Sequence, residues 1–372
     1  MMTASRRQVV LGMGAGLAAS YGLGFSGKLS ATQPRRKLGY AIVGLGSYAT
    51  NQIMPRIGNC EHARLTALVS GTPEKLARYG AEYGIPSTHH YNYANFDSIR
   101  DNPDIDIVYV VLPNSMHAEY TIRAAQAGKH VMCEKPMAIS SAECEAMIAA
   151  CRKAGTKLMI GYRSQFEPHN LYAMALAQSG ELGPTRIITS EHGFYAQPDQ
   201  WRLERPLSGG GSLMDIGIYS LQAARYLAGE EPFEVTAMET TDRSDPRFAT
   251  VEDRIDFQLR FPSGAMASCV SSYSSNHNTY RFHGREGFLR AEPATSYEGH
   301  QFWVHRGGET EQVVLPPPAK DQFVAQLDHL PEAIFAGVAP RASGEEGLRD
   351  MRIIEAIYQS AREGRAIGLA AS

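Results

Sequence analysis

The stretch Leu38–Ala49 constrains the fold most, because an apolar segment runs directly into a glycine-rich turn. Tyr40–Val43 are apolar and partly β-branched, which predicts a buried parallel strand. Gly44-x-Gly46-x-x-Ala49 and a helix-compatible run follow. Gly44 allows a tight turn, Gly46 lets a pyrophosphate approach the backbone, and Ala49 lets the helix pack on the strand. The flanks favour a dinucleotide site over a plain glycine turn, with cofactor contacts from Gly44, Leu45, Gly46, Ser47 and Tyr48.

Residues 1–31 differ in character from the rest of the chain. Arg6-Arg7 precedes a Gly/Ala-rich apolar run from Leu11 to Phe25. A twin arginine before such a run is typical of a Tat-type export signal, and the run is too short and too glycine-rich to span a bilayer comfortably. We therefore predict a signal peptide at 1–31, a periplasmic location and no stable membrane insertion after export. Residues 32–37 would then form an exposed N-terminal arm, placed to lie over the nucleotide.

Charge and cysteine content exclude several other classes of protein. The net charge is −3, which gives no electrostatic case for binding nucleic acid. The five cysteines are odd in number and contain no Cys-x-x-Cys pair, so neither a disulfide framework nor a zinc knuckle is indicated. We predict no metal site.

The order of apolar segments predicts two domains of an α/β protein. Strands alternate with helices up to Arg163, which predicts an N-terminal Rossmann domain at 38–163 with a doubly wound parallel sheet. After it, six strands between residues 234 and 305 follow one another with little helix between them. This pattern predicts a C-terminal α+β domain at 164–372 with a large, mostly antiparallel open sheet. The open face of that sheet must be covered, and self-association would cover it, so we predict a homodimer or homotetramer.

The end of the second predicted strand bears on the choice of nucleotide. Rossmann sites that select NAD place an acid there to bind the ribose, but this chain has Ser70-Gly71 and then Lys75. A hydroxyl and an ammonium suit a 2′-phosphate, so the segment favours NADP. The alternative is that Lys75 is simply a solvated helix residue. A later strand ends at the turn Pro113-Asn114-Ser115-x-His117, at the sheet edge where α/β proteins bind ligands.

Four segments together resemble the Gfo/Idh/MocA family of oxidoreductases: Gly44-Leu45-Gly46, Pro113-Asn114-Ser115-x-His117, residues 127–136 ending in Glu134-Lys135-Pro136, and residues 210–219 with Gly210-Gly211-x-x-x-Asp215-x-Gly217. Within the family, Ser70-Gly71, Gln200-Trp201-Arg202-Leu203 and Asp215-Ile216-Gly217-Ile218-Tyr219 are similar to the periplasmic glucose–fructose and aldose–aldose oxidoreductases. The resemblance implies a sugar substrate and tightly bound NADP(H). It also implies further cofactor contacts from Tyr93, Leu112, Pro113, Asn114, His117, Glu134, Lys135, Arg163, Trp201, Arg202 and Tyr297.

The same motifs supply the groups that sugar oxidation needs. Oxidising an aldose at C1 sends a hydride to nicotinamide and a proton to a base. Tyr219 can be that base if a cation stabilises its phenolate, and Lys135 is the candidate cation. Asp215 lies four residues before Tyr219, so one helix would present both to the same side. Taken singly, Tyr219 also fits a packed core aromatic, and Asp215 fits a carboxylate favoured by a helix N-terminus. His169 is interpreted as structural, and a structural role is the alternative for His117.

These residues predict a ping-pong enzyme that oxidises an aldose to its lactone and reduces a second sugar, aldose or ketose, to the alditol. An ordinary NADP-dependent aldose 1-dehydrogenase with exchangeable cofactor is one alternative. Another is an NAD-dependent glycoside hydrolase of the same fold, which Tyr219 and the Ser70–Lys75 pair disfavour. A sugar sensor without turnover is disfavoured by the presence of Lys135, Asp215 and Tyr219 together.

Overall fold

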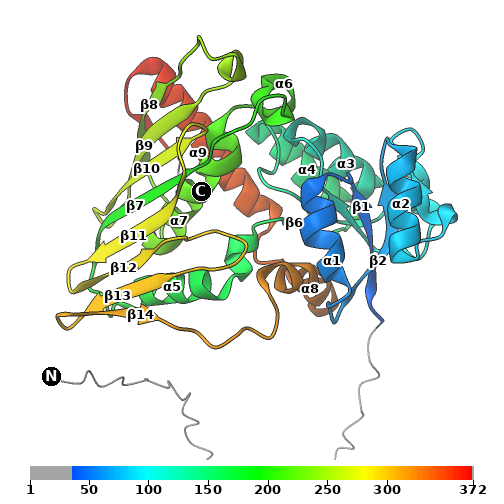
Figure 1. Ribbon diagram of the computed structural model, residues 1–372, viewed down its shortest axis with the longest axis horizontal. Helices are drawn as coiled ribbons and strands as arrows, with labels where there is room; N and C mark the ends of the chain where they lie inside the picture. Colours follow the sequence, from blue (N-terminus) through cyan, green and yellow to red (C-terminus); the bar gives the residue numbers. More distant parts are fainter. Residues whose placement is uncertain (1–35, 371–372) are drawn as a thin grey trace, which may run out of the picture. The chain divides into compact units, whose positions relative to one another are not determined.

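A computed structural model describes residues 36–370, so the predicted signal at 1–31 lies outside the described residues. The N-terminal part contains a six-stranded parallel sheet in the order β3-β2-β1-β4-β5-β6 (Figure 1). Its strands are β1 (Leu38–Val43), β2 (Ala63–Val69), β3 (His90–Tyr91), β4 (Ile107–Val110), β5 (His130–Cys133) and β6 (Leu158–Ile160). β1 pairs in register with β4, from Tyr40 opposite Ile107 to Val43 opposite Val110. The predicted doubly wound Rossmann sheet is confirmed.

Helices connect these strands as the crossover rule requires. They are α1 (Met54–Ile57), α2 (Pro73–Tyr83), α3 (His117–Gln126) and α4 (Ser141–Ala154), and a π-helical turn, η1 (Ala49–Ile53), precedes α1. α4 shows why the sequence sets these limits. The Ser140 hydroxyl accepts from the Glu143 backbone N–H at 3.3 Å, and Gly155 ends the helix in the left-handed conformation.

A helix from the C-terminal end of the chain completes the Rossmann part. α8 (Gln322–Ala336) contacts β1, because the Tyr40 hydroxyl donates to the Leu327 carbonyl at 2.8 Å. The Asp328 carboxylate accepts from the backbone N–H groups of Glu61 and His62 at 3.0 and 2.8 Å. The segment assigned by sequence to a second domain therefore returns to cover the first.

The C-terminal part contains a nine-stranded sheet in the order β14-β13-β12-β11-β7-β10-β9-β8-β15. Its strands are β7 (Thr185–Gly193), β8 (Glu234–Thr240), β9 (Arg254–Arg260), β10 (Met266–Ser272), β11 (His277–Gly284), β12 (Gly287–Ala291), β13 (Phe302–Arg306), β14 (Glu309–Val313) and β15 (Ile367–Gly368). All neighbouring strands pair antiparallel except β7 and β10. The predicted mostly antiparallel sheet is confirmed, but its central strand, β7, was not predicted.

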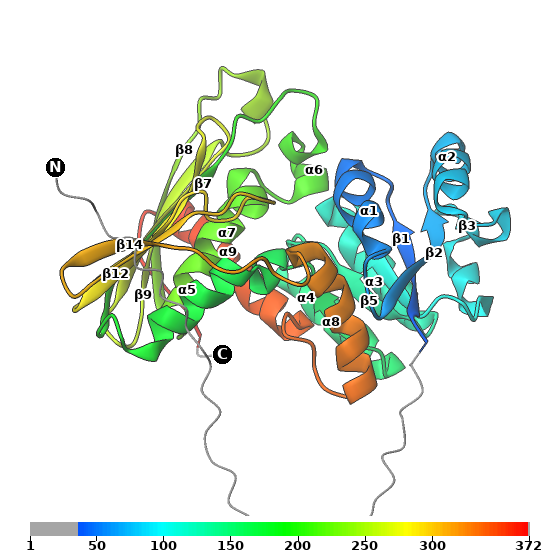
Figure 2. The same ribbon diagram turned by 60° about the horizontal axis from the view of Figure 1, so that its bottom comes forward.

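The two faces of this sheet differ. α5 (Pro168–Ser179), α7 (Ile218–Ala228) and α9 (Gly344–Glu363) lie on one side of it (Figure 2). The other side carries no helix of the described chain (Figure 2). Three exposed apolar side chains alternate along their strands with buried residues and so face that side: Ile187 (53%), Met266 (44%) and Met238 (74%). Ile187 and Met266 are direct partners across β7 and β10. Such a face is consistent with the predicted self-association.

The described end of the predicted N-terminal arm lies away from the nucleotide side. The Arg36 guanidinium donates to the Asp106 carboxylate at 2.8 and 2.6 Å, and Asp106 directly precedes β4. This is the amino-terminal edge of the sheet, whereas Rossmann folds bind nucleotide at the carboxyl ends of the strands. The Arg36 end of the arm therefore lies at the opposite edge of the sheet, and residues 32–35 lie outside the described range, so the expectation that the arm at 32–37 covers the nucleotide stays a prediction. Among residues 36–370, no helix has both the length and the apolar character needed to cross a bilayer.

Candidate active site

The turn after β1 has the shape that a pyrophosphate requires. Gly44 has φ of +96°, and a Cβ there would lie 2.2 Å from the Val111 carbonyl oxygen. A Cβ on Gly46 would meet nothing within 4 Å, so its open side leaves room for a ligand. Only glycine fits the first position, and the second admits close approach to the backbone.

Lys75 is exposed, but the end of its side chain reaches this turn. Its Nζ donates to the Leu45 carbonyl at 3.0 Å. The Ser70 hydroxyl accepts from the Thr72 N–H at 3.1 Å and fixes the loop after β2. Gly71 is pressed against Tyr93, since a Cβ there would lie 3.0 Å from the Tyr93 ring. The predicted Ser70, Gly71, Lys75 and Tyr93 thus share one edge of the site.

His117 holds the loops after β4 and β5 together. Its ring is fully buried, and its two nitrogens lie 2.8 Å from the carbonyl oxygens of Leu112 and Pro136. A buried ring whose nitrogens both face backbone carbonyls favours the structural role of His117 over a cofactor contact. Asn114, in the same loop, donates from Nδ2 to the Ser208 carbonyl at 2.8 Å. The predicted Leu112, Pro113 and Asn114 therefore lie in a loop that is fixed to the second domain.

Glu134 is buried beside the candidate cation. The Tyr109 hydroxyl donates to its carboxylate, and a Cβ on Gly161 would come within 2.5 Å of it. Burial raises the pKa of Glu134, and the Tyr109 hydrogen bond and the charge of Lys135 only partly oppose this.

The structure brings together the three predicted catalytic side chains. Lys135 Nζ donates to the Asp215 backbone carbonyl and lies 3.4 Å from Asp215 Oδ1. The same nitrogen is 4.8 Å from the centre of the Tyr219 ring. Lys135 comes from the loop after β5, whereas Asp215 lies in the turn directly before α7 and Tyr219 lies at the start of α7, in the second domain. The site therefore forms where the two domains meet.

Two residues hold the other oxygen of Asp215. Arg202 Nε lies 3.0 Å from Oδ2, and the Tyr273 hydroxyl donates to it at 3.1 Å. Burial alone would raise the Asp215 pKa, but the charges of Lys135 and Arg202 and the Tyr273 hydrogen bond hold it below its ordinary value. Asp215 is thus a carboxylate that positions two cations. No sequence motif pointed to Tyr273, which follows β10.

The helix that carries Asp215 and Tyr219 is not uniform. Residues Leu213–Gly217 form a π-helical turn, η7, and α7 begins at Ile218. A Cβ on Gly217 would lie 2.6 Å from the Ser271 side chain, and one on Gly211 would lie 2.0 Å from the Glu252 carbonyl. The glycines of the motif therefore let this turn approach the sheet. The predicted regular helix is corrected: a π-helical turn, a feature common at functional sites, sets the Asp215–Tyr219 spacing.

Glu252 anchors the start of this turn and was missed by sequence reasoning. Its side chain is buried at 2% exposure, and its carboxylate accepts from the backbone N–H groups of Gly211 (2.7 Å) and Leu213 (3.0 Å). The Tyr358 hydroxyl donates to it at 2.8 Å. A glutamate in an otherwise ordinary loop gives no sequence signal for this role.

Cations and aromatic rings line the remaining wall. The buried Arg163 guanidinium lies 5.1 Å from the Tyr219 ring centre and 4.7 Å from that of Tyr297. Tyr297 lies 6.3 Å from Tyr48 of the nucleotide turn, and Arg202 stacks on Trp201 at 4.7 Å. The predicted Tyr48, Arg163, Trp201, Arg202 and Tyr297 thus surround the Lys135–Asp215–Tyr219 group.

Comparison with known proteins agrees with this geometry. Residues 38–162 match the family model for the oxidoreductase family with an NAD-binding Rossmann fold, and residues 171–290 match the Gfo/Idh/MocA C-terminal domain. The chain belongs to the Gfo/Idh/MocA oxidoreductase family. The predicted resemblance is confirmed.

Individual Gfo/Idh/MocA relatives include sugar enzymes. The structure of aldose-aldose oxidoreductase from Caulobacter crescentus complexed with glycerol is 62% identical, with a TM-score of 0.89, over 90% of this chain and 100% of that one. D-xylose 1-dehydrogenase [NADP(+)] of Haloarcula marismortui is 31% identical over 89% of this chain and 92% of its own length. 1,5-Anhydro-D-fructose reductase of Ensifer adhaerens is 27% identical over 88% of this chain and 97% of its own length.

Proposed function

We propose that this protein is a sugar oxidoreductase that oxidises an aldose at C1 to the aldonolactone and reduces a second sugar, aldose or ketose, to the alditol. The observation that carries the proposal is the position of Lys135 Nζ, 3.4 Å from Asp215 Oδ1 and 4.8 Å from the Tyr219 ring centre. A phenol beside a fixed cation is suited to proton transfer at a sugar hydroxyl. The names of the aldose-aldose oxidoreductase and the xylose dehydrogenases support a sugar substrate.

The residues of the nucleotide turn fit NADP. Gly46 leaves its backbone open, and Lys75 places an ammonium beside the turn, where a 2′-phosphate gains a charge-assisted contact. The two xylose dehydrogenases are named for NADP(+), in agreement with the predicted cofactor. Gly44–Tyr48, Ser70 and Lys75 would hold the nucleotide. When bound, NADP accepts the hydride of the aldose C1 and returns it to the second sugar.

In the first half-reaction, the Tyr219 oxygen takes the proton of the C1 hydroxyl. Lys135 stabilises the resulting phenolate, and Asp215 fixes Lys135 by its carboxylate and its backbone carbonyl. In the second half-reaction, Tyr219 returns the proton to the oxygen of the carbonyl being reduced. Arg202 then presents donors to sugar hydroxyls, while Arg163, whose guanidinium donates to Thr295, Ser296 and Gln322, supports the wall beside Tyr219.

Export would explain why two sugars share one pocket. If residues 1–31 direct the folded protein to the periplasm, the NADP bound before export cannot be replaced outside. A slowly dissociating cofactor must then be reoxidised in place, and the cycle is ping-pong. An ordinary aldose dehydrogenase, or an NAD-dependent glycoside hydrolase, would need no such retention.

Single-turnover absorbance tests this cycle. Purified enzyme mixed with an aldose alone is expected to form about one reduced nicotinamide per chain and stop, as a ping-pong half-reaction requires. Adding a second sugar should reverse the signal. Continuous turnover that depends on added NADP would contradict cofactor retention, and release of nitrophenol from a nitrophenyl glycoside without net oxidation would favour the hydrolase.

A variant pair tests the proton transfer. Tyr219→Phe is expected to lower kcat by roughly 10²–10⁴-fold while leaving NADP affinity unchanged, because it removes only the acid/base hydroxyl. Tyr195→Phe, at an exposed tyrosine, is the matched control and should leave kcat unchanged. Near-normal kcat in Tyr219→Phe would place the acid/base elsewhere.

A further inference from the structure

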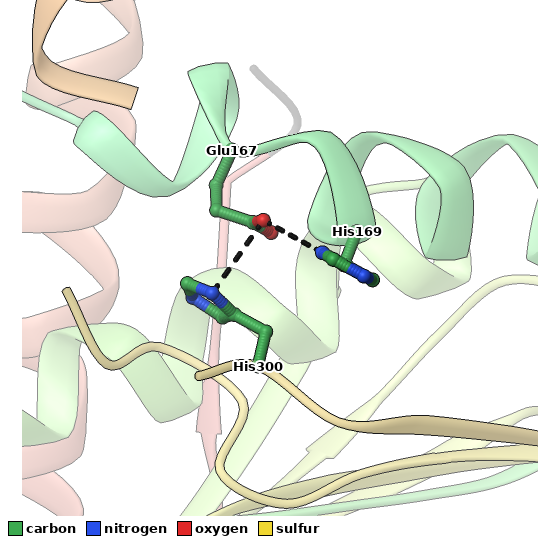
Figure 3. Close-up of side chains that lie close together, drawn as sticks. All are labelled: Glu167, His169 and His300. Carbon is green, nitrogen blue, oxygen red and sulfur yellow. Dashed lines mark hydrogen bonds and ion pairs between the residues drawn. The ribbon is translucent and has the colours of Figure 1, made fainter. Parts of the chain in front are cut away.

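A second cluster of titratable side chains lies behind the active-site wall. Glu167 precedes α5, His169 lies in its first turn, and His300 lies in the loop before β13 (Figure 3). Glu167 Oε1 is 3.0 Å from His169 Nδ1 and 3.6 Å from His300 Nδ1. Each residue offers one ligand atom, and the three atoms lie within 4.8 Å of one another.

Helix capping accounts for only one oxygen of Glu167. Oε2 accepts from the backbone N–H and the side-chain amide of Asn170, at 2.7 and 3.0 Å, and so caps α5. Oε1 faces the two imidazoles instead, as Figure 3 shows. The arrangement therefore contains a carboxylate oxygen that the cap does not need.

The protein groups around His300 satisfy its ring only in part, since the ring has a hydrogen bond with the Ser296 backbone. Its side chain is 6% exposed, and Nε2 is buried without a hydrogen-bond partner among residues 36–370. The 3.6 Å separation from Glu167 is too long for a hydrogen bond. The rings of His169 and His300 stack at 5.9 Å with an interplanar angle of 17°. The unpartnered nitrogen is Nε2, whereas Nδ1 is the nitrogen that faces Glu167, so this imidazole keeps unused hydrogen-bonding capacity inside the protein.

We propose that Glu167, His169 and His300 bind a Zn²⁺ ion. Two imidazoles and one carboxylate form a known ligand set for zinc, with a water molecule in the fourth position. Tetrahedral zinc with bonds of about 2.0–2.1 Å separates its ligand atoms by about 3.3 Å. The Glu167–His169 hydrogen bond of 3.0 Å and the Glu167–His300 separation of 3.6 Å lie on either side of that value. The two imidazole nitrogens lie within 4.8 Å of each other, so the ion would replace the hydrogen bond and draw the imidazoles together.

The ion would brace the active-site wall without contacting substrate. His300 follows the segment in which the carbonyl oxygens of Thr295 and Ser296 accept from Arg163, at 2.6 and 3.2 Å. Arg163 in turn faces the Tyr219 ring. Zinc would tie this loop to the start of α5 and hold Arg163 in place. The site rests on its own residues and is independent of the proposed reaction.

Metal analysis of the full chain, prepared without a histidine tag, tests the site. The protein is stripped with dipicolinate, loaded with Zn²⁺, desalted and measured by mass spectrometry. About one zinc per chain is expected for the wild type, as for a three-residue site of this kind. His169→Gln and His300→Gln should lose it, and His305→Gln, at a histidine of β13 outside the cluster, should retain it.

Two outcomes would overturn the proposal. One is a wild-type protein that retains no stoichiometric zinc after desalting. The other is equal retention in His300→Gln and in the wild type. Cobalt(II) loading of the wild type keeps the test valid if a variant fails to fold, because tetrahedral coordination gives intense visible absorption. Weak absorption typical of octahedral surface binding would also overturn it.

Discussion

Replacing Glu252 by glutamine tests whether this residue holds the turn that carries the catalytic side chains. The wild-type carboxylate accepts from the N–H groups of Gly211 and Leu213 and from the Tyr358 hydroxyl. A glutamine keeps the shape but has one acceptor oxygen instead of two. Its NH₂ group must then face one of the two backbone donors, which leaves a buried N–H unsatisfied.

The cost follows from these three contacts. A hydrogen bond to a charged acceptor contributes about 1.5–3 kcal/mol, and an unsatisfied buried donor costs about 1–3 kcal/mol. Burial already raises the pKa of Glu252, so removing its charge recovers part of this loss. We expect the free energy of unfolding to fall by about 2–4 kcal/mol. kcat should fall too, because the displaced backbone precedes Asp215 and Tyr219.

Urea unfolding and steady-state kinetics measure the two effects. Glu355→Gln is the matched control, since the Glu355 carboxylate accepts from the Ser141 backbone N–H and hydroxyl, both at 2.7 Å, away from the site. It should lower stability by about 0.5–1.5 kcal/mol and leave kcat unchanged. Surface substitutions usually change the free energy of unfolding by less than about 0.5 kcal/mol. If Glu252→Gln changes it by no more than that, Glu252 does not anchor the turn.

Three further predictions concern the nucleotide, the pH dependence and the open sheet. Lys75→Ala should weaken NADP binding by roughly tenfold or more and leave NAD binding nearly unchanged, because it removes a charge-assisted contact with the 2′-phosphate; calorimetry with both nucleotides measures this. The Asp215 pKa lies below its ordinary value, so the stability this group contributes is present above about pH 4 and lost as pH falls further. Below about pH 4, the difference in free energy of unfolding between the wild type and Asp215→Asn, measured with urea, should therefore shrink. A difference that does not change with pH would contradict a lowered Asp215 pKa. Light scattering should show a dimer or tetramer at micromolar concentration, and Met238→Asp with Ile187→Asp should dissociate it; a monomeric wild type would refute self-association through this face.

Local patterns in the sequence were sufficient for the Rossmann half. β1 and its glycine turn depend on neighbours in sequence, and the apolar run, Gly44 and Gly46 specify both. The grouping of the proposed catalytic residues was also predictable, because Lys135, Asp215 and Tyr219 lie in motifs with fixed spacing. Their approach within a few ångströms confirms that the motifs converge.

Contacts between distant residues were not predictable in the same way. β7 alternates weakly and contains polar residues on both faces, yet it lies at the centre of its sheet. Glu252 and Tyr273 contribute single polar groups from loops, and nothing near them in sequence marks their partners. His117 lies in a sequence motif, but its ring nitrogens contact backbone carbonyl oxygens. Its burial depends on how two loops pack, which local spacing does not specify.

The active site depends on contacts that pass between the two domains in both directions. Lys135 comes from the Rossmann part, and its partner Asp215 comes from the second domain. In return, α8 covers β1, and Gln326 of α8 donates to the Tyr109 hydroxyl at 3.2 Å, which itself donates to Glu134 beside Lys135. Lys135 is therefore positioned from two sides. Asp215 contacts it directly, and the buried hydrogen bonds from Gln326 through Tyr109 fix its neighbour Glu134. Because neither domain contains all of these groups, the second domain supplies part of the support for the Rossmann site as well as the substrate wall.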